Sequence, residues 1–156
     1  MLDEMLKFKP YDLRSLEAHS FVAELNTELS AMYPEEGATH FRLNPAEVQK
    51  GKGVFLIAVK GNCHLGCGAL RTIDELTGEL KRMYVKPEAR KKGVGRELVR
   101  ALEKEAKALG LTRIVLETGE RQLAAIALYK GEGYYQIPAY GEYVNSPLSI
   151  CMAKDI

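Results

Sequence analysis

The sequence predicts an α/β (α+β) domain built on a mixed, mostly antiparallel sheet of six to seven strands, flanked by about four helices. Three short strand-like segments, at residues 54–59, 63–70 and 79–85, follow one another with only turns between them, which is typical of an antiparallel meander. Apolar residues then recur every three to four positions over 98–109, and a strand-like run follows at 113–117. That order predicts a right-handed crossover with two parallel strands.

The N-terminal third carries weaker signals. Residues 5–9 alternate and predict a first strand. Apolar residues at helical spacing predict a helix that begins at Leu13, is capped by Asp12 and stops before Pro34. Residues 34–52 predict a long loop with one helical turn within it, and a loop of this length in a small domain is usually functional or mobile.

The C-terminal part completes the predicted sheet. Gly110 is well placed to end the helix that packs on the sheet. A second helix is predicted over residues 122–130, followed by strands near 134–140 and 148–153.

Length and composition fit one soluble domain over residues 1–156, with 46% hydrophobic and 28% charged residues. Because no apolar run approaches a membrane span and the first residues lack the order of a signal peptide, we expect no membrane partner and a cytoplasmic location. The cysteines Cys63, Cys67 and Cys151 form no Cys-x-x-Cys pair, and the three histidines are scattered, so no metal site is predicted.

Charge is balanced overall but not locally. The formal net charge is +1, which excludes a generally basic nucleic-acid binder. Nine basic and only four acidic residues nevertheless lie between Lys86 and Arg113. A local positive patch on a neutral protein favours a compact polyanionic ligand over a long nucleic acid.

The most informative stretch lies between a predicted strand and a predicted helix. It reads Arg90-Lys91-Lys92-Gly93-Val94-Gly95 and is followed by Arg96. Unpaired amides and the positive dipole end at a helix start, together with close backbone approach at glycine and added cations, predict a pyrophosphate cradle. The Walker pattern is absent, and the dinucleotide fingerprint fails because Leu98 stands where its third glycine belongs. An Arg/Gln-x-x-Gly-x-Gly/Ala pattern fits.

A second motif lies downstream, where Tyr129 is followed after three residues by Gly133 and Tyr134. The strand at 79–85, the glycine loop, the helix after it and this closing motif resemble the GNAT (Gcn5-related) N-acetyltransferase family in order and spacing. The resemblance extends over about residues 53–153 and is that of a small, single-domain, bacterial-type member. It implies the acyl-CoA N-acyltransferase fold of that family, with residues 1–52 on the acceptor side and 53–153 as the acetyl-CoA-binding core.

The resemblance also implies where acetyl-CoA lies. The pyrophosphate would rest on the backbone amides of the glycine loop, and the pantetheine arm would run like an extra strand beside residues 83–85. A backbone N–H there would face the thioester oxygen. The implied cofactor-binding residues are Met83, Tyr84, Val85, Arg90, Lys91, Lys92, Gly93, Val94, Gly95, Arg96, Gln122 and Ala125. Gln122 stands where many family members carry Asn, so its side chain has a longer stem.

Two catalytic residues are implied. Glu79 matches the general base of part of the family, and its strand parity predicts that it shares a face with Lys81, Met83 and Val85. Tyr129 matches the tyrosine that donates a proton to the departing thiolate. A solvent-facing glutamate and a core tyrosine are the alternatives.

The acceptor wall in this family is formed by the first helix and the loop after it. Tyr33 is therefore a candidate substrate-binding residue, and Arg82 is another. His40, Phe41 and Arg42 are further candidates, and any of the five could hold a carboxylate if the acceptor carries one.

Three functions remain open. The first is an acyltransferase (EC 2.3.1.-) that moves an acetyl group from acetyl-CoA to a primary amine of a small molecule, by direct attack in a ternary complex. The second is a protein or peptide N-acetyltransferase, which an acidic acceptor groove would favour. The third is a CoA-binding sensor without turnover, which the presence of both Glu79 and Tyr129 argues against. A homodimer is expected to use the last strands.

Overall fold

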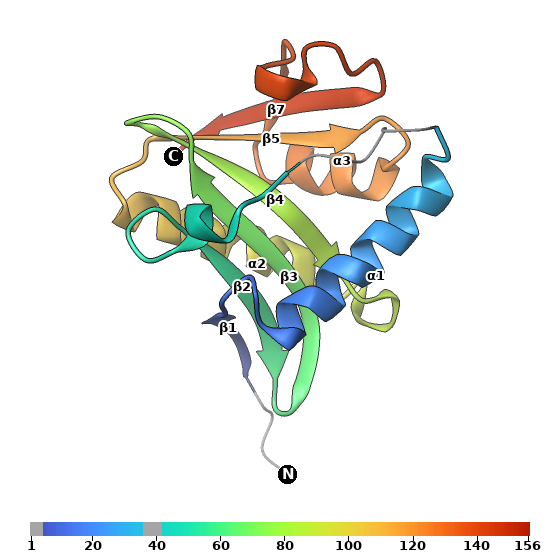
Figure 1. The fold of residues 1–156 in the computed structure, drawn as a ribbon, viewed down its shortest axis with the longest axis vertical. Helices are drawn as coiled ribbons and strands as arrows, with labels where there is room; N and C mark the ends of the chain where they lie inside the picture. Colours follow the sequence, from blue (N-terminus) through green and yellow to red (C-terminus); the bar gives the residue numbers. More distant parts are fainter. Residues whose placement is uncertain (1–4, 36–41) are drawn as a thin grey trace.

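The computed structural model describes residues 5–35 and 42–156, which form one sheet with helices on both faces (Figure 1). The sheet has seven strands in the order β1-β2-β3-β4-β5-β7-β6. In chain order the strands are β1 (Leu6–Pro10), β2 (Gly53–Lys60), β3 (Cys63–Thr72), β4 (Thr77–Val85), β5 (Arg113–Gly119), β6 (Tyr135–Ile137) and β7 (Ser149–Asp155). Only β4 and β5 pair in parallel, so the predicted mixed sheet and its crossover are confirmed.

The described residues contain three α-helices, where about four were expected. They are α1 (Leu16–Met32), α2 (Val94–Ala108) and α3 (Leu123–Gly131). Short 3₁₀ turns, η1 (Pro45–Val48), η2 (Pro87–Ala89) and η3 (Gly141–Tyr143), supply the other helical segments. The turn expected in the loop after α1 is η1.

The two faces of the sheet are covered by different helices. Leu56 and Leu70 pack with Leu98 and Leu102 of α2, and Tyr129 of α3 belongs to the same core. On the other face, alternate residues of the same strands, including Phe55 and Ile57, pack with Ala18, Phe21 and Leu25 of α1. This alternation follows from the period of two in a strand. It sets α1 opposite α2 and α3, so the ends of β4 and β5 lie between the layers.

The predicted start of α1 is wrong by three residues. Ser15, and not Asp12, is the N-cap, and its hydroxyl accepts a hydrogen bond from the Ala18 amide at 3.2 Å. Asp12 instead accepts from the backbone amide and the guanidinium of Arg14. Because its carboxylate is engaged in that local turn, the helix begins at the next capping residue.

The face predicted for Met83 and Val85 is also wrong. The β3–β4 register shifts between Cys67 and Ala69, and Arg82 adopts a left-handed φ of 56°. A bulge with one extra residue inverts the alternation beyond it. As a result, Met83 packs on the α2 face, whereas Tyr84 packs on the α1 face.

At the far edge, β6 is shorter than predicted. It ends at Ile137 because Pro138 has no N–H to continue the ladder. Tyr135 on this edge strand is 47% exposed.

Candidate active site

A cleft opens where β4 and β5 separate. Their last paired residues are Leu80 and Leu116, although the strands continue to Val85 and Gly119. Figure 1 shows β4 and β5 diverging. The cleft is lined by residues of α1, of β4 from 80 to 83, of β5 from 117 to 119, of α3 and of the segment before β7. Beyond Leu80, the β5-facing edge of β4 therefore borders the cleft, which leaves room for an extended ligand to add as a strand.

The glycine loop ends at the N-terminus of α2. Lys91 and Gly93 have left-handed φ angles of 63° and 85°, and Gly93 is the N-cap of the helix. Such a turn directs successive amides to one side, where the helix dipole also attracts an anion. A side chain at Gly95 would approach Leu128 of α3 to 3.2 Å, so glycine lets α3 pack closely against this turn. The predicted cradle is thus brought beside β4 and α3.

The side chain of Arg90 has other partners. Its Nε donates to the Val85 carbonyl at 2.8 Å, and Nη2 pairs with Glu28 of α1 at 2.6 Å. The guanidinium also lies over the Tyr84 ring, 5.6 Å from its centroid. These contacts connect the start of the glycine loop to β4 and α1. The Arg90 side chain therefore holds the loop in position, and its guanidinium is engaged by protein groups. Lys91, Lys92 and Arg96 are exposed, while Val94 is buried under the turn.

The closing motif places a buried phenol on the wall of the cleft. Tyr129 is 5% exposed, lines the cleft and packs edge-to-face against Tyr134 at 5.9 Å. Burial raises the pKa of the Tyr129 phenol, so it keeps its proton at neutral pH. Gln122 precedes α3 and also lines the cleft. Ala125 is half-buried and packs toward the α2-face core.

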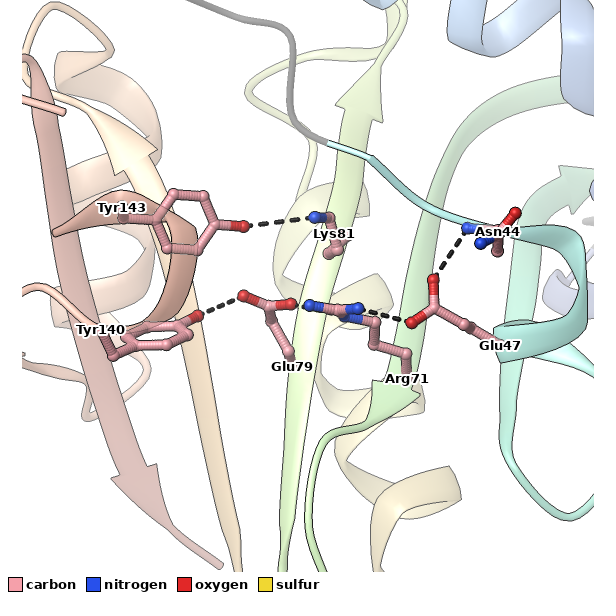
Figure 2. Close-up of polar contacts among 7 residues, drawn as sticks. All are labelled: Asn44, Glu47, Arg71, Glu79, Lys81, Tyr140 and Tyr143. Carbon is pink, nitrogen blue, oxygen red and sulfur yellow. Dashed lines mark hydrogen bonds and ion pairs between the residues drawn. The ribbon is translucent and has the colours of Figure 1, made fainter. Parts of the chain in front are cut away.

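Glu79 lies inside a network of polar contacts. Its side chain is fully buried, and one carboxylate oxygen accepts from Arg71 Nε at 2.7 Å. The other oxygen accepts from the Tyr140 hydroxyl. Arg71 also pairs with Glu47 of η1 at 2.5 Å. Figure 2 shows these contacts linking the loop before β2, strands β3 and β4, and the segment after β6. The Glu79 carboxylate itself lies outside the cleft wall that the described residues form.

A second carboxylate, which sequence reasoning missed, lies on the wall. Glu117 of β5 lines the cleft and accepts a hydrogen bond from the Ser149 hydroxyl at 2.5 Å. Burial raises the pKa of Glu117, with the Ser149 hydrogen bond acting in the opposite direction. The available signal was an acidic residue directly after the apolar run Ile114-Val115-Leu116, because a lone charge in a buried strand is unusual.

Two cations face the same cleft. Lys81 and Arg82 both line it, and Lys81 Nζ donates to the Tyr143 hydroxyl at 3.2 Å (Figure 2). Burial lowers the pKa of both Lys81 and Arg82. The cleft therefore holds charges of both signs.

Tyr33, a predicted substrate residue, also lines the cleft but is only 5% exposed. Its oxygen accepts from the Arg121 backbone amide at 2.7 Å, and the Arg121 guanidinium lies over its ring at 4.9 Å. A side chain at Gly119 would collide with the Tyr33 hydroxyl. Tyr33 thus fastens the end of α1 to the end of β5. Arg42 is exposed, and His40 and Phe41 lie outside the described residues.

Within residues 5–35 and 42–156, no cluster of side chains could hold a metal ion. No helix in those ranges has the length and hydropathy to cross a membrane.

Known proteins of similar sequence identify the family of the chain. A sequence model of the acetyltransferase (GNAT) family matches residues 11–134. An IAA acetyltransferase of Azospirillum brasilense is 38% identical over 136 residues, which cover 86% of this chain and 88% of that protein. Both matches extend well into the N-terminal third, which the sequence motifs alone did not cover.

Solved structures agree in fold. A proposed acyl-CoA N-acyltransferase of Klebsiella pneumoniae superposes with a TM-score of 0.82 at 30% identity, covering 97% of both chains. A GNAT acetyltransferase of Elizabethkingia anophelis, with acetyl-CoA bound, superposes with a TM-score of 0.68 at 17% identity, covering 97% of this chain and 98% of that one. The fold predicted from sequence is confirmed. The chain belongs to the GNAT acetyltransferase family and is an acyltransferase.

Proposed function

We propose that the protein transfers the acetyl group of acetyl-CoA to a primary amine of a small molecule, by direct attack in a ternary complex. The observation that carries this proposal is that the amide-rich turn at the start of α2 packs against Val85 at the end of β4, the strand whose residues 80–83 line the cleft. An anion site and an open strand edge, joined in this way, suit a pyrophosphate with an extended arm. The Elizabethkingia anophelis relative of the same fold binds acetyl-CoA.

The chain would hold acetyl-CoA mainly through its backbone. The amides of residues 91–96 would bind the pyrophosphate, with Lys91, Lys92 and Arg96 adding charge at the surface. The β5-facing edge of residues 83–85 would pair with the pantetheine arm. Gln122 is positioned to offer its amide to that arm, whereas half-buried Ala125 offers only apolar contact.

The reaction needs two proton movements. When the amine attacks the thioester carbon, negative charge develops on the carbonyl oxygen, and a fixed N–H donor there is worth roughly 3–4 kcal/mol. The C–S bond then breaks, and the thiolate takes a proton from Tyr129. We assign the role to this phenol because it lines the cleft.

The amine must also lose a proton, and two carboxylates are candidates. Glu79, the base predicted from sequence, has both oxygens engaged by Arg71 and Tyr140 and would need a relay through a tyrosine hydroxyl. Glu117 lines the cleft, and burial raises its pKa toward the working range of a base. We therefore propose Glu117 as the proton acceptor, and the role predicted for Glu79 is tested beside it.

The acceptor side favours a small molecule. Among the described residues, the wall carries Lys81 and Arg82 and one carboxylate, Glu117, so that part of the wall is not the acidic groove expected for basic peptides. The N-terminal residues to about 52 would serve the acceptor, and 53–153 the acetyl-CoA core. A cytoplasmic location, and a homodimer through the last strands over residues 134–156, belong to the same proposal.

The test is acetyl-CoA-dependent thiol release with a panel of small amines, amino acids, polyamines and short basic peptides, alongside thermal stabilisation by acetyl-CoA. We expect turnover with a small amine and loss of roughly 10²-fold or more in Tyr129→Phe. When kcat/KM is measured against pH, the wild-type value should fall at low pH as the base becomes protonated. Glu117→Gln should remove that fall, whereas Glu79→Gln should retain it. Turnover with peptides alone would contradict the small-molecule acceptor and favour a peptide N-acetyltransferase. Stabilisation without turnover of any amine would favour the sensor function.

A further inference from the structure

Two cations that a regular strand would separate lie on one wall of the cleft. Lys81 and Arg82 are neighbours on β4, and side chains of neighbouring strand residues normally point to opposite faces. Arg82 has a φ of 56° at the bulge, and both residues line the cleft. A left-handed conformation costs a residue with a Cβ about 1–2 kcal/mol, and such strain tends to occur at functional sites.

Both cations are partly removed from water. Lys81 is 6% exposed, and burial lowers its pKa, while the Glu79 carboxylate acts in the opposite direction. Burial likewise lowers the pKa of Arg82, while Tyr143 and Glu142 act in the opposite direction. Glu79 is already paired with Arg71, and Glu142 is exposed. An anion in the cleft would lie beside both buried cations and would add its attraction to the contacts that they already make.

The charges on opposite walls are arranged for a zwitterion. Glu117 lies on β5, facing the cleft from the strand opposite Lys81 and Arg82. A carboxylate near the proposed reaction centre attracts an amine, and a Lys–Arg pair attracts an anionic group on the same molecule. Leu25, Leu29 and Leu148 add apolar side chains to the lining.

We propose that the acceptor is an amine that also carries a carboxylate, held by Lys81 and Arg82 while its amino group lies toward Glu117. This inference rests on the proposed acetyl transfer and names the substrate class for it. A monoanion fits because Glu117 in the same cleft opposes a second negative charge. Carboxylate also matches the planar, two-pronged donor geometry of arginine.

The test is calorimetric binding to the protein saturated with CoA, which binds without turnover. The probes are glycine, leucine and phenylalanine, each paired with its own carboxamide. We expect at least one amino acid to bind roughly 10- to 100-fold more tightly than its carboxamide, as for hydrogen bonds to a charged group. Equal affinities within every pair, or no binding by any amino acid, would overturn the proposal.

Variants then assign the effect. Arg82→Gln and Lys81→Met should each reduce the preference for carboxylate over carboxamide by about tenfold or more, and Arg82→Lys should restore part of it. Lys60→Met, at an exposed lysine where β2 ends, is the matched control and should leave the preference unchanged. An undiminished preference in both cleft variants would refute the assignment of the site. So would tighter binding of 2-aminoethyl phosphate than of β-alanine.

Acetyl-CoA stabilisation and thiol release, measured on the same samples, separate this inference from the proposed function. If acetyl-CoA binds and amines are acetylated regardless of a carboxylate, only the acceptor class is wrong. If acetyl-CoA neither stabilises the protein nor releases thiol with any amine, the proposed acetyl transfer itself fails.

Discussion

Replacing Arg71 with methionine should destabilise the protein strongly, because it leaves the Glu79 carboxylate buried without its cation. The Arg71–Glu79 pair joins Nε and an oxygen at 2.7 Å, and the Glu79 side chain is fully buried. Removing one partner of such a pair costs about 3–5 kcal/mol. For a chain of this length, each kcal/mol lowers Tm by roughly 2–4 °C, so we expect a loss of about 10 °C.

The same arginine provides an internal control. Its second pair, with Glu47, joins side chains that are 21% and 32% exposed. Screening by water keeps an ion pair of this kind near 1 kcal/mol or below, so Glu47→Gln should lower Tm by only a few degrees. Urea unfolding at neutral pH would give both free energies, and the Arg71→Met/Glu79→Met double variant would close a double-mutant cycle.

The double-mutant cycle shows whether the lost stability comes from the Arg71–Glu79 interaction or from Arg71 alone. Adding Glu79→Met to Arg71→Met should recover much of the lost stability, because no uncompensated carboxylate remains. A cost below about 1 kcal/mol for Arg71→Met would refute this account of the network. Equal costs for Arg71→Met and Glu47→Gln would do so as well.

Other perturbations address the cleft directly. Tyr129→Phe should lower kcat by roughly 10²-fold while leaving acetyl-CoA affinity, measured by calorimetry, nearly unchanged; an equal loss of affinity would indicate a binding role. Burial raises the pKa of Glu117, so the stability that this residue confers is complete below pH about 4.5 and is lost as pH rises through its folded pKa. Glu117→Gln should therefore raise Tm at pH 7.5 but not near pH 4, and a gain equal at both pH values would contradict that cause. Gly119→Ala should cost about 1–3 kcal/mol in urea unfolding because its Cβ collides with the Tyr33 hydroxyl, whereas Gly131→Ala, with open space around it, should be neutral or stabilising. Similar losses in both alanine variants would show that the collision is relieved elsewhere.

Local patterns predicted the sheet and the helix after the glycine loop because the spacing of apolar residues in these segments is regular. Residues 98–109 predict a buried helix face, and Leu98, Leu102 and Ala106 of α2 are fully buried. The parallel pairing of β4 with β5 follows from the strand–helix–strand order alone. The family resemblance added the closing motif, which the structure brings to the cleft through Tyr129.

Features that depend on particular hydrogen bonds, or on contacts between distant parts of the chain, were not predictable from its periodicity. Asp12 and Ser15 are both good caps, and only the hydrogen bonds of Asp12 to Arg14 decide between them. No glycine or proline marks the bulge at Arg82 in the sequence. The bulge nevertheless changes which side chains of β4 lie on the same face. The hydrogen bond between the Arg121 amide and the Tyr33 hydroxyl joins residues 88 positions apart, so no local pattern predicts it.

The central claim is direct transfer of an acetyl group from acetyl-CoA to an amine held in the cleft between β4 and β5. Mass spectrometry of a single turnover with labelled acetyl-CoA would follow the acetyl group in the presence and absence of the acceptor. The account predicts labelled N-acetyl product and free CoA in equal amounts, with no acetylated protein when the acceptor is left out. Acetylated protein that forms first and then passes its label to the amine would contradict direct transfer.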